Sequence, residues 1–113
     1  DYETPGDPEV NRRMALCSFH MSDHDSAGNR MGMISNIDMT ESDYRLLGHI
    51  AFLKRNMEEA SRFYRLTVRP NDEKRLWKSQ ILADLDMLTA LGASRSDLIL
   101  LLESIAYSLE NKH

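Results

Sequence analysis

The chain has 113 residues, of which 42% are hydrophobic and 28% are charged, and its formal net charge is −4 at pH 7. This composition is typical of one globular domain and excludes a collagen-like or fully disordered chain. A single cysteine excludes an internal disulfide framework, and the longest apolar run, 98–102, is far shorter than the roughly 18 residues of a membrane span.

The first predicted helix covers residues 8–21. Asp7 suits the N-cap, where its carboxylate accepts hydrogen bonds from free backbone N–H groups, and Pro8 suits the first helical position. Apolar residues recur at helical spacing at Val10, Met14, Cys17 and Met21. We expect this face, including Cys17, to lie in the core. Residues 22–39 show no periodicity, so we expect a mobile loop.

A second helix is predicted over about 41–54 and a third over about 57–68. Thr40 suits the N-cap of the first of these, and Asp43 completes a capping box. Asn56, just before the third helix, favours a turn and a cap. Helical spacing predicts the inward residues of this pair, which are Tyr44, Leu47, Ala51, Met57, Ala60, Tyr64 and Val68.

The fourth helix is predicted to open at 71–73, where two acids favour the positive end of its dipole, and to end before Gly92. Ser94 then caps a fifth helix that extends to about residue 109. The predicted core stripes of these helices are Trp77, Ile81, Leu85, Leu88 and Leu91, then Leu98, Leu101, Leu102, Ile105 and Leu109.

These patterns predict an all-α fold, because no alternating strand pattern occurs. We expect a single helical domain over 1–113, a small bundle. A short N-terminal helix and mobile loop fill 1–39, and two antiparallel hairpins follow at 40–69 and 71–110. Residues 1–20 could also be an extension, since Met21 resembles a natural start.

The hairpin at 41–72 resembles a tetratricopeptide (TPR) repeat. The resemblance rests on Tyr44, Leu47, Gly48, Ala60 and Tyr64. Small residues at 48 and 60 would let the two helices approach, with the two tyrosines covering the crossing. The chain departs from the family pattern at Ala51, Thr67 and Pro70. The resemblance implies one TPR-like hairpin in a bundle or a degenerate three-hairpin protein. The alternative is an unrelated antiparallel hairpin, because close helix packing favours the same small and aromatic residues.

TPR repeats bind peptides or helices through the inner face of the first helix of each hairpin. The resemblance therefore implies a partner-binding stripe at Ser42, Arg45, His49 and Phe52. It implies non-catalytic protein binding, by an adaptor, a regulator or a small secretion-type chaperone. A competing interpretation places Phe52 beneath the N-terminal helix.

Catalytic and cofactor motifs are absent, so we expect no enzyme activity and no cofactor. The cluster of His20, Asp23, His24 and Asp25 has metal-like spacing, but no distant ligand completes it. A solvated polar loop explains the cluster better, and we expect no metal.

An alternative function rests on Arg62, Arg65 and Arg69, which share one helical face. Such a face could contact nucleic acid or an acidic partner, as in a small transcription regulator. Neighbouring acids interrupt this face and the whole chain is acidic, which disfavours nucleic acid.

The fifth helix is apolar on more than one face. Ile99 and Leu100 are predicted to point away from the fourth helix, where they would support self-association, as a homodimer, or contact with a client protein.

No membrane contact is expected. The acidic N-terminus lacks the apolar segment of a signal peptide, so we expect a cytoplasmic location.

Overall fold

The computed structural model describes residues 7–68 and 74–110. These residues form seven helices and no strand, which confirms the all-α class. The helices are α1 (Pro8–His20), α2 (His24–Met31), α3 (Glu41–Leu53), α4 (Met57–Arg65), α5 (Lys74–Leu82), α6 (Leu85–Ala90) and α7 (Arg95–Glu110). None of them is long and apolar enough to span a membrane.

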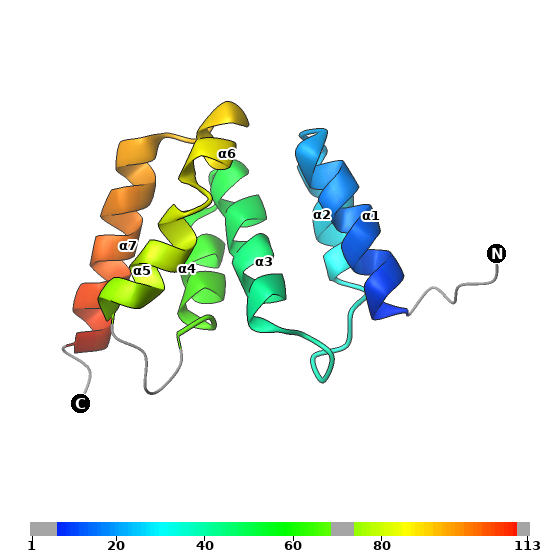
Figure 1. Ribbon diagram of the computed structural model, residues 1–113, viewed down its shortest axis with the longest axis horizontal. Helices are drawn as coiled ribbons and strands as arrows, with labels where there is room; N and C mark the ends of the chain where they lie inside the picture. The colour runs from blue at the N-terminus through cyan, green and yellow to red at the C-terminus, as the bar shows by residue number, and fades with distance from the viewer. Residues whose placement is uncertain (1–6, 69–73, 111–113) are drawn as a thin grey trace.

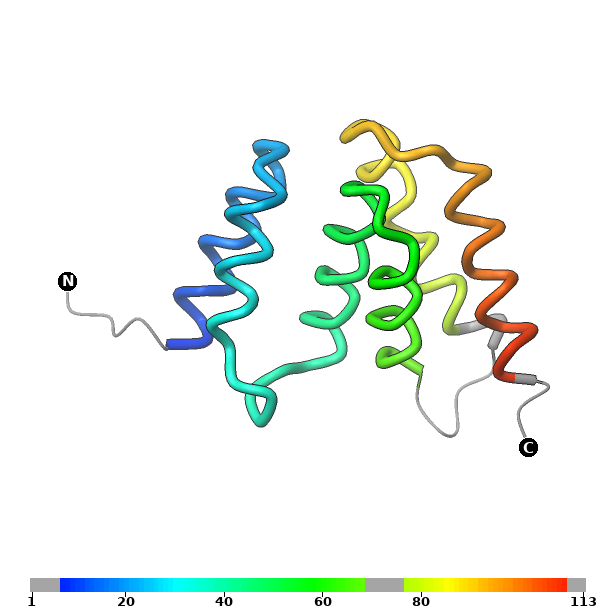
Figure 2. The backbone as a smooth tube through the Cα atoms, turned by 180° about the vertical axis from the view of Figure 1, so that it is seen from behind, coloured from blue at the N-terminus to red at the C-terminus, as the bar shows by residue number. Residues whose placement is uncertain are grey.

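Helices α1 to α4 run alternately up and down, α5 and α6 together lead back up, and α7 runs down again (Figure 1). Helix α1 packs on α2, and α3 packs on α4. Seen from behind, the α3–α4 pair lies between the N-terminal pair and the C-terminal helices (Figure 2). Helix α2 packs on α3, whereas α4 and α5 pack on α7. The buried apolar side chains of these helices form one core cluster.

Helix α1 begins as predicted, but the predicted inward face was wrong. The Asp7 carboxylate accepts a hydrogen bond from the Glu9 backbone N–H at 3.0 Å. The apolar residues packed inside are Ala15 and Phe19, both fully buried. Met14 is 41% exposed, and the Cys17 thiol is also exposed rather than part of the core. The face of α1 that is buried is the one that packs on α2. The spacing of the larger apolar residues predicted a different face.

The predicted loop at 22–39 was also wrong, because it contains α2. The Asp23 carboxylate caps this helix by accepting a hydrogen bond from the Ser26 backbone N–H at 3.2 Å. Ala27 and Met31, four residues apart, are fully buried, and Ile34 is buried just beyond the helix end. The N-terminal region is therefore a helical pair and not a helix followed by a loop.

The caps of the central pair are confirmed. The Asp43 backbone N–H donates to the Thr40 hydroxyl at 3.2 Å, and the Thr40 N–H donates to the Asp43 carboxylate at 2.9 Å. At the start of α4 the Glu59 N–H donates to the Asn56 side chain at 3.2 Å. Helix α4 ends at Arg65, before the predicted residue 68.

Helices α3 and α4 approach closely at Gly48. A Cβ atom added there would lie 2.5 Å from two ring carbons of Tyr64. Tyr64 and Ala60 are fully buried, whereas Met57, predicted to face inward, is 37% exposed. The small residue at position 48 therefore allows the tyrosine ring to lie against the α3 backbone.

The predicted fourth helix is interrupted. Helix α5 ends at Leu82 and α6 starts at Leu85, although the predicted stripe is buried at Trp77, Ile81, Leu85 and Leu88. The predicted opening at 71–73 lies outside the described residues.

Gly92 has a φ of +106°, which suits its predicted place after a helix end. Helix α7 follows the Ser94 cap, whose hydroxyl accepts a hydrogen bond from the Asp97 N–H at 3.4 Å.

Candidate functional site

A groove of about 340 Å³ opens between α1, α3 and α6. It is bounded by the sides of α1 and α6, and α3 contributes the most residues. We call this surface the groove, and its lining residues are Arg12, Leu16, Ser42, Asp43, Arg45, Leu46, His49, Asp84 and Met87.

Three of the four predicted partner-binding residues line this groove: Ser42, Arg45 and His49. Their spacing of three and four residues aligns them along one face of α3. Phe52, the fourth predicted residue, does not line the groove and belongs to the core cluster. His49 lines the groove but is only 2% exposed, so Ser42 and Arg45 are the more accessible members of the stripe.

The α1 side of the groove is fixed by Arg12. Its Nε donates to both oxygens of Asp43 at 2.9 and 3.0 Å, and its Nη2 donates to one of them at 2.8 Å. Its Nη1 donates to Glu9 at 2.7 Å, and its Nη2 also donates to the Asp38 carbonyl oxygen at 2.6 Å. These bonds raise the pKa of the Arg12 guanidinium. Arg12 thus attaches α1 to the first turn of α3.

Asp43 is a buried carboxylate with two structural roles. Burial pushes its pKa upward, but hydrogen bonds from Arg12 and from the Thr40 backbone outweigh burial, so the pKa is lowered overall. The same side chain closes the capping box of α3 and accepts the Arg12 pair. The carboxylate therefore stays ionised near neutral pH.

The α6 side of the groove is fixed by a partly buried series of hydrogen bonds. His49 Nε2 donates to the Asp84 carboxylate at 2.9 Å, and His49 Nδ1 lies 2.8 Å from the Tyr64 hydroxyl. The hydrogen bond from His49 lowers the pKa of Asp84, and the charge of Arg45 acts in the same direction. Burial raises the pKa of Tyr64, and so does the Asp84 charge. This series joins α4, α3 and α6.

Asp84 lies in the break between α5 and α6, at the N-cap of α6. It makes no side-chain cap hydrogen bond, and its carboxylate instead contacts His49. Arg45 lies between Glu41, at 3.6 Å, and Asp84, at 3.8 Å. The interruption of the predicted fourth helix therefore turns a carboxylate toward the groove.

The apolar walls of the groove come from three different helices: Leu16 of α1, Leu46 of α3 and Met87 of α6. Leu16 is 45% exposed, and Leu46 and Met87 are partly buried. Exposed apolar side chains beside fixed polar groups suit the binding of another molecule. Within 7–68 and 74–110, no group of three or more His, Cys, Asp or Glu could hold a metal ion.

The other predicted binding surfaces lie outside this groove. Arg62 pairs with Glu59, and its guanidinium lies 4.4 Å from the centre of the Phe63 ring. Arg65 donates to the Ser108 hydroxyl at 3.2 Å, whereas Arg69 lies outside the described residues.

The residues predicted to support self-association lie on the exposed side of α7. Ile99 is 36% exposed and Leu100 is 67% exposed. Neither residue lines the groove.

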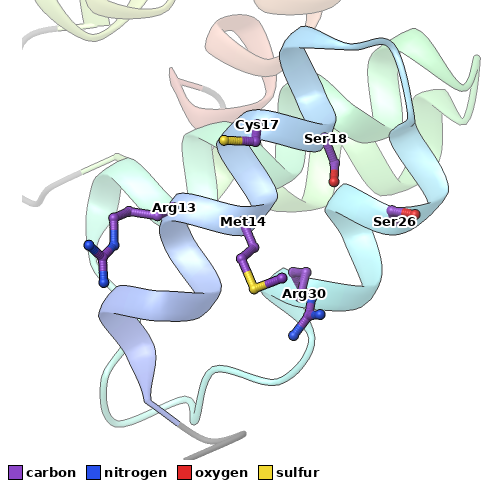
Figure 3. Close-up of a pocket in the computed structure, with 6 residues that line it drawn as sticks. All are labelled: Arg13, Met14, Cys17, Ser18, Ser26 and Arg30. Carbon is purple, nitrogen blue, oxygen red and sulfur yellow. The ribbon is translucent and has the colours of Figure 1, made fainter. Parts of the chain in front are cut away.

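A second pocket, of about 450 Å³, lies between α1 and α2 (Figure 3). Its lining residues are Arg13, Met14, Cys17, Ser18, Ser26 and Arg30. The picture shows Met14 of α1 and Arg30 of α2 close together. Met14 and Cys17, two of the residues predicted to form the inner face of α1, thus line an outer pocket.

Sequence reasoning missed all four groove residues outside α3, which are Arg12, Leu16, Asp84 and Met87. Arg12 and Leu16 are four residues apart and share a face of α1, which was a usable signal, but the larger apolar residues on another face obscured it. Asp84 gave no signal, because a continuous fourth helix would not have singled it out. Asp43 was predicted as a cap and not as a partner of Arg12.

Comparison of the chain with protein-family models, with curated proteins and with solved structures finds no match in any of the three.

Proposed function

We propose that this protein is a non-catalytic binding module that holds a peptide or helix of another protein in the groove. The observation that carries the proposal is an agreement between the residues that the TPR resemblance implies and the residues that line the groove. The TPR resemblance implies a stripe of Ser42, Arg45, His49 and Phe52, and the first three of these line a groove with apolar walls. The roles that fit are those of an adaptor, a regulator or a small secretion-type chaperone.

The physical basis is helix-in-groove recognition, in which apolar anchors give affinity and fixed polar groups give orientation. Leu16, Leu46 and Met87 can receive apolar side chains. Arg45 is held near Asp84, and the buried His49 in turn holds Asp84 by a hydrogen bond. Because the polar groups are ordered before binding, a partner would not have to order them itself. Nucleic-acid contact through Arg62 has weaker support, because Arg62 is already paired with Glu59.

Site-specific photo-crosslinking in the native cell tests this proposal. A photoreactive amino acid at Leu16, which is 45% exposed, should give one discrete adduct with a partner protein. The matched control is Met33, which is 50% exposed and lies outside the groove. The substitution Met87→Glu should abolish the Leu16 adduct, because a charge would replace an apolar wall. Equal adducts at both positions, or no adduct at Leu16, would contradict the proposal.

A further inference from the structure

We infer that the groove selects a basic partner: an amphipathic helix that carries Lys or Arg beside its apolar face. This inference rests on the proposed function and adds the chemistry of the ligand.

The two arginines of the groove are already engaged within the chain. Arg12 donates to Asp43, Glu9 and the Asp38 carbonyl oxygen, which uses most of its N–H groups. Arg45 lies between two carboxylates, Glu41 and Asp84. Neither guanidinium is therefore well placed to attract an acidic ligand.

Carboxylates outnumber arginines around the groove. The acids that pair with Arg12 and Arg45 are Glu9, Glu41, Asp43 and Asp84. The local charge is therefore negative whether His49 is neutral or protonated. The whole chain, at −4, has the same sign and would favour the approach of a cation.

Asp84 is the accessible member of this set inside the groove. Its side chain is 36% exposed, compared with 5% for Asp43 and 24% for Arg45. The hydrogen bond from His49 lowers its pKa, so Asp84 is ionised at neutral pH. A carboxylate accepts through two oxygens, and the His49 and Arg45 contacts both involve Oδ2. Both contacts use one oxygen, so the other oxygen of this partly exposed carboxylate can accept from a cation of the partner.

The spacing of the apolar and acidic groups sets the pattern of the ligand. Met87 follows Asp84 by three residues, so the two side chains lie on one side of the α6 turn. A partner helix with a Lys or Arg three or four positions from an apolar residue would match both. The volume of about 340 Å³ is at the small end of ligand pockets, which suits a few side chains of a helix rather than a large ligand.

Two synthetic peptides test the inference with the full chain. Both are amphipathic, about 18 residues long and identical on the leucine face, and they differ only in carrying Lys or Glu at the flanking positions. Fluorescence anisotropy measures their affinities at low and high salt. We expect the lysine peptide to bind roughly tenfold more tightly at low salt, and we expect salt to reduce the difference.

Two variants separate the groove from the overall charge of the chain. Asp84→Asn should lower the affinity for the lysine peptide roughly threefold to tenfold. Asp86→Asn removes the same charge from an exposed side chain two residues further along, in α6 and outside the groove, and it should change the affinity little. Equal losses in the two variants would overturn the inference.

The peptide pair also separates failure of the preference for a basic partner from failure of the proposed function. If both peptides bind equally and Leu16→Glu weakens both, the groove binds helices, but the preference for a basic partner is wrong. If the glutamate peptide binds more tightly, the inference is likewise overturned. If neither peptide binds, the proposed function and the inference both fail.

Discussion

Asp43 shows how one residue serves both local and long-range structure. Its capping box with Thr40 is predictable from sequence, because both partners lie within four residues. Its pair with Arg12 joins residues 31 positions apart, and no short-range pattern indicates such a contact. Sequence reasoning therefore found the cap and missed the ion pair that attaches α1 to α3.

The lowered pKa of Asp43 predicts a pH-dependent contribution to stability. A carboxyl group whose folded pKa lies below its unfolded value of about 3.9 stabilises the fold above that value, and the contribution is lost as the pH falls through the folded pKa. Asp43→Asn should lower the free energy of unfolding by about 2 kcal/mol at pH 7. Urea denaturation should show that this difference shrinks near pH 3. A constant difference at both pH values would contradict the assignment.

Gly48 and Gly28 give a matched pair of substitutions with opposite expected signs. Gly48→Ala places a Cβ 2.5 Å from the buried Tyr64 ring and should destabilise the fold by about 2 kcal/mol. At Gly28 the added Cβ would lie 3.9 Å from Ile50, an ordinary contact. Gly28→Ala should therefore stabilise by about 0.5–1 kcal/mol, since alanine favours a helix interior. Chemical denaturation measures both effects, and a stable Gly48→Ala variant would contradict the close approach of α3 and α4.

At the scale of elements, strong caps and long apolar stripes were predictable, while short helices were not. Helix α2 has eight residues and buries Ala27 and Met31, which is too few apolar positions for a periodic signal. The break before α6 was missed because Trp77, Ile81 and Leu85 continue one apparent stripe. The interaction of Asp84 with His49 accompanies this break and has no local signature.

Helix α7 carries the prediction about self-association. The double change Ile99→Glu and Leu100→Lys should leave a helical protein, because these side chains are 36% and 67% exposed. The free energy of unfolding should change by less than about 1 kcal/mol. If the exposed face supports self-association, light scattering should show a smaller species for the variant than for the parent.

A control at a buried position of α7 makes this test specific. Leu102→Glu places a charge at a position that is 1% exposed and should unfold the protein. An unchanged molecular mass in the double variant would exclude self-association through Ile99 and Leu100. Loss of its helical circular dichroism would place those residues in the core.

At the scale of the whole molecule, the fold class was predictable and the groove was not. Helical periodicity is a local property, so an all-α fold follows from the chain itself. The groove combines Leu16, Leu46 and Met87 from three separate helices. Its α1 wall depends on the unpredicted pairing of α1 with α2. Only the α3 portion was predictable, because the TPR resemblance covers that helix.

Methyl NMR with ¹³C-labelled methionine tests the central claim most directly. Met87 lines the groove, whereas Met14 lines the pocket between α1 and α2, and Met57 is 37% exposed at the start of α4. On titration with the lysine-bearing peptide, the Met87 methyl signal should shift while the Met14 and Met57 signals stay unchanged. A shift at Met14 or Met57 with no change at Met87 would show that binding occurs elsewhere and would contradict the account.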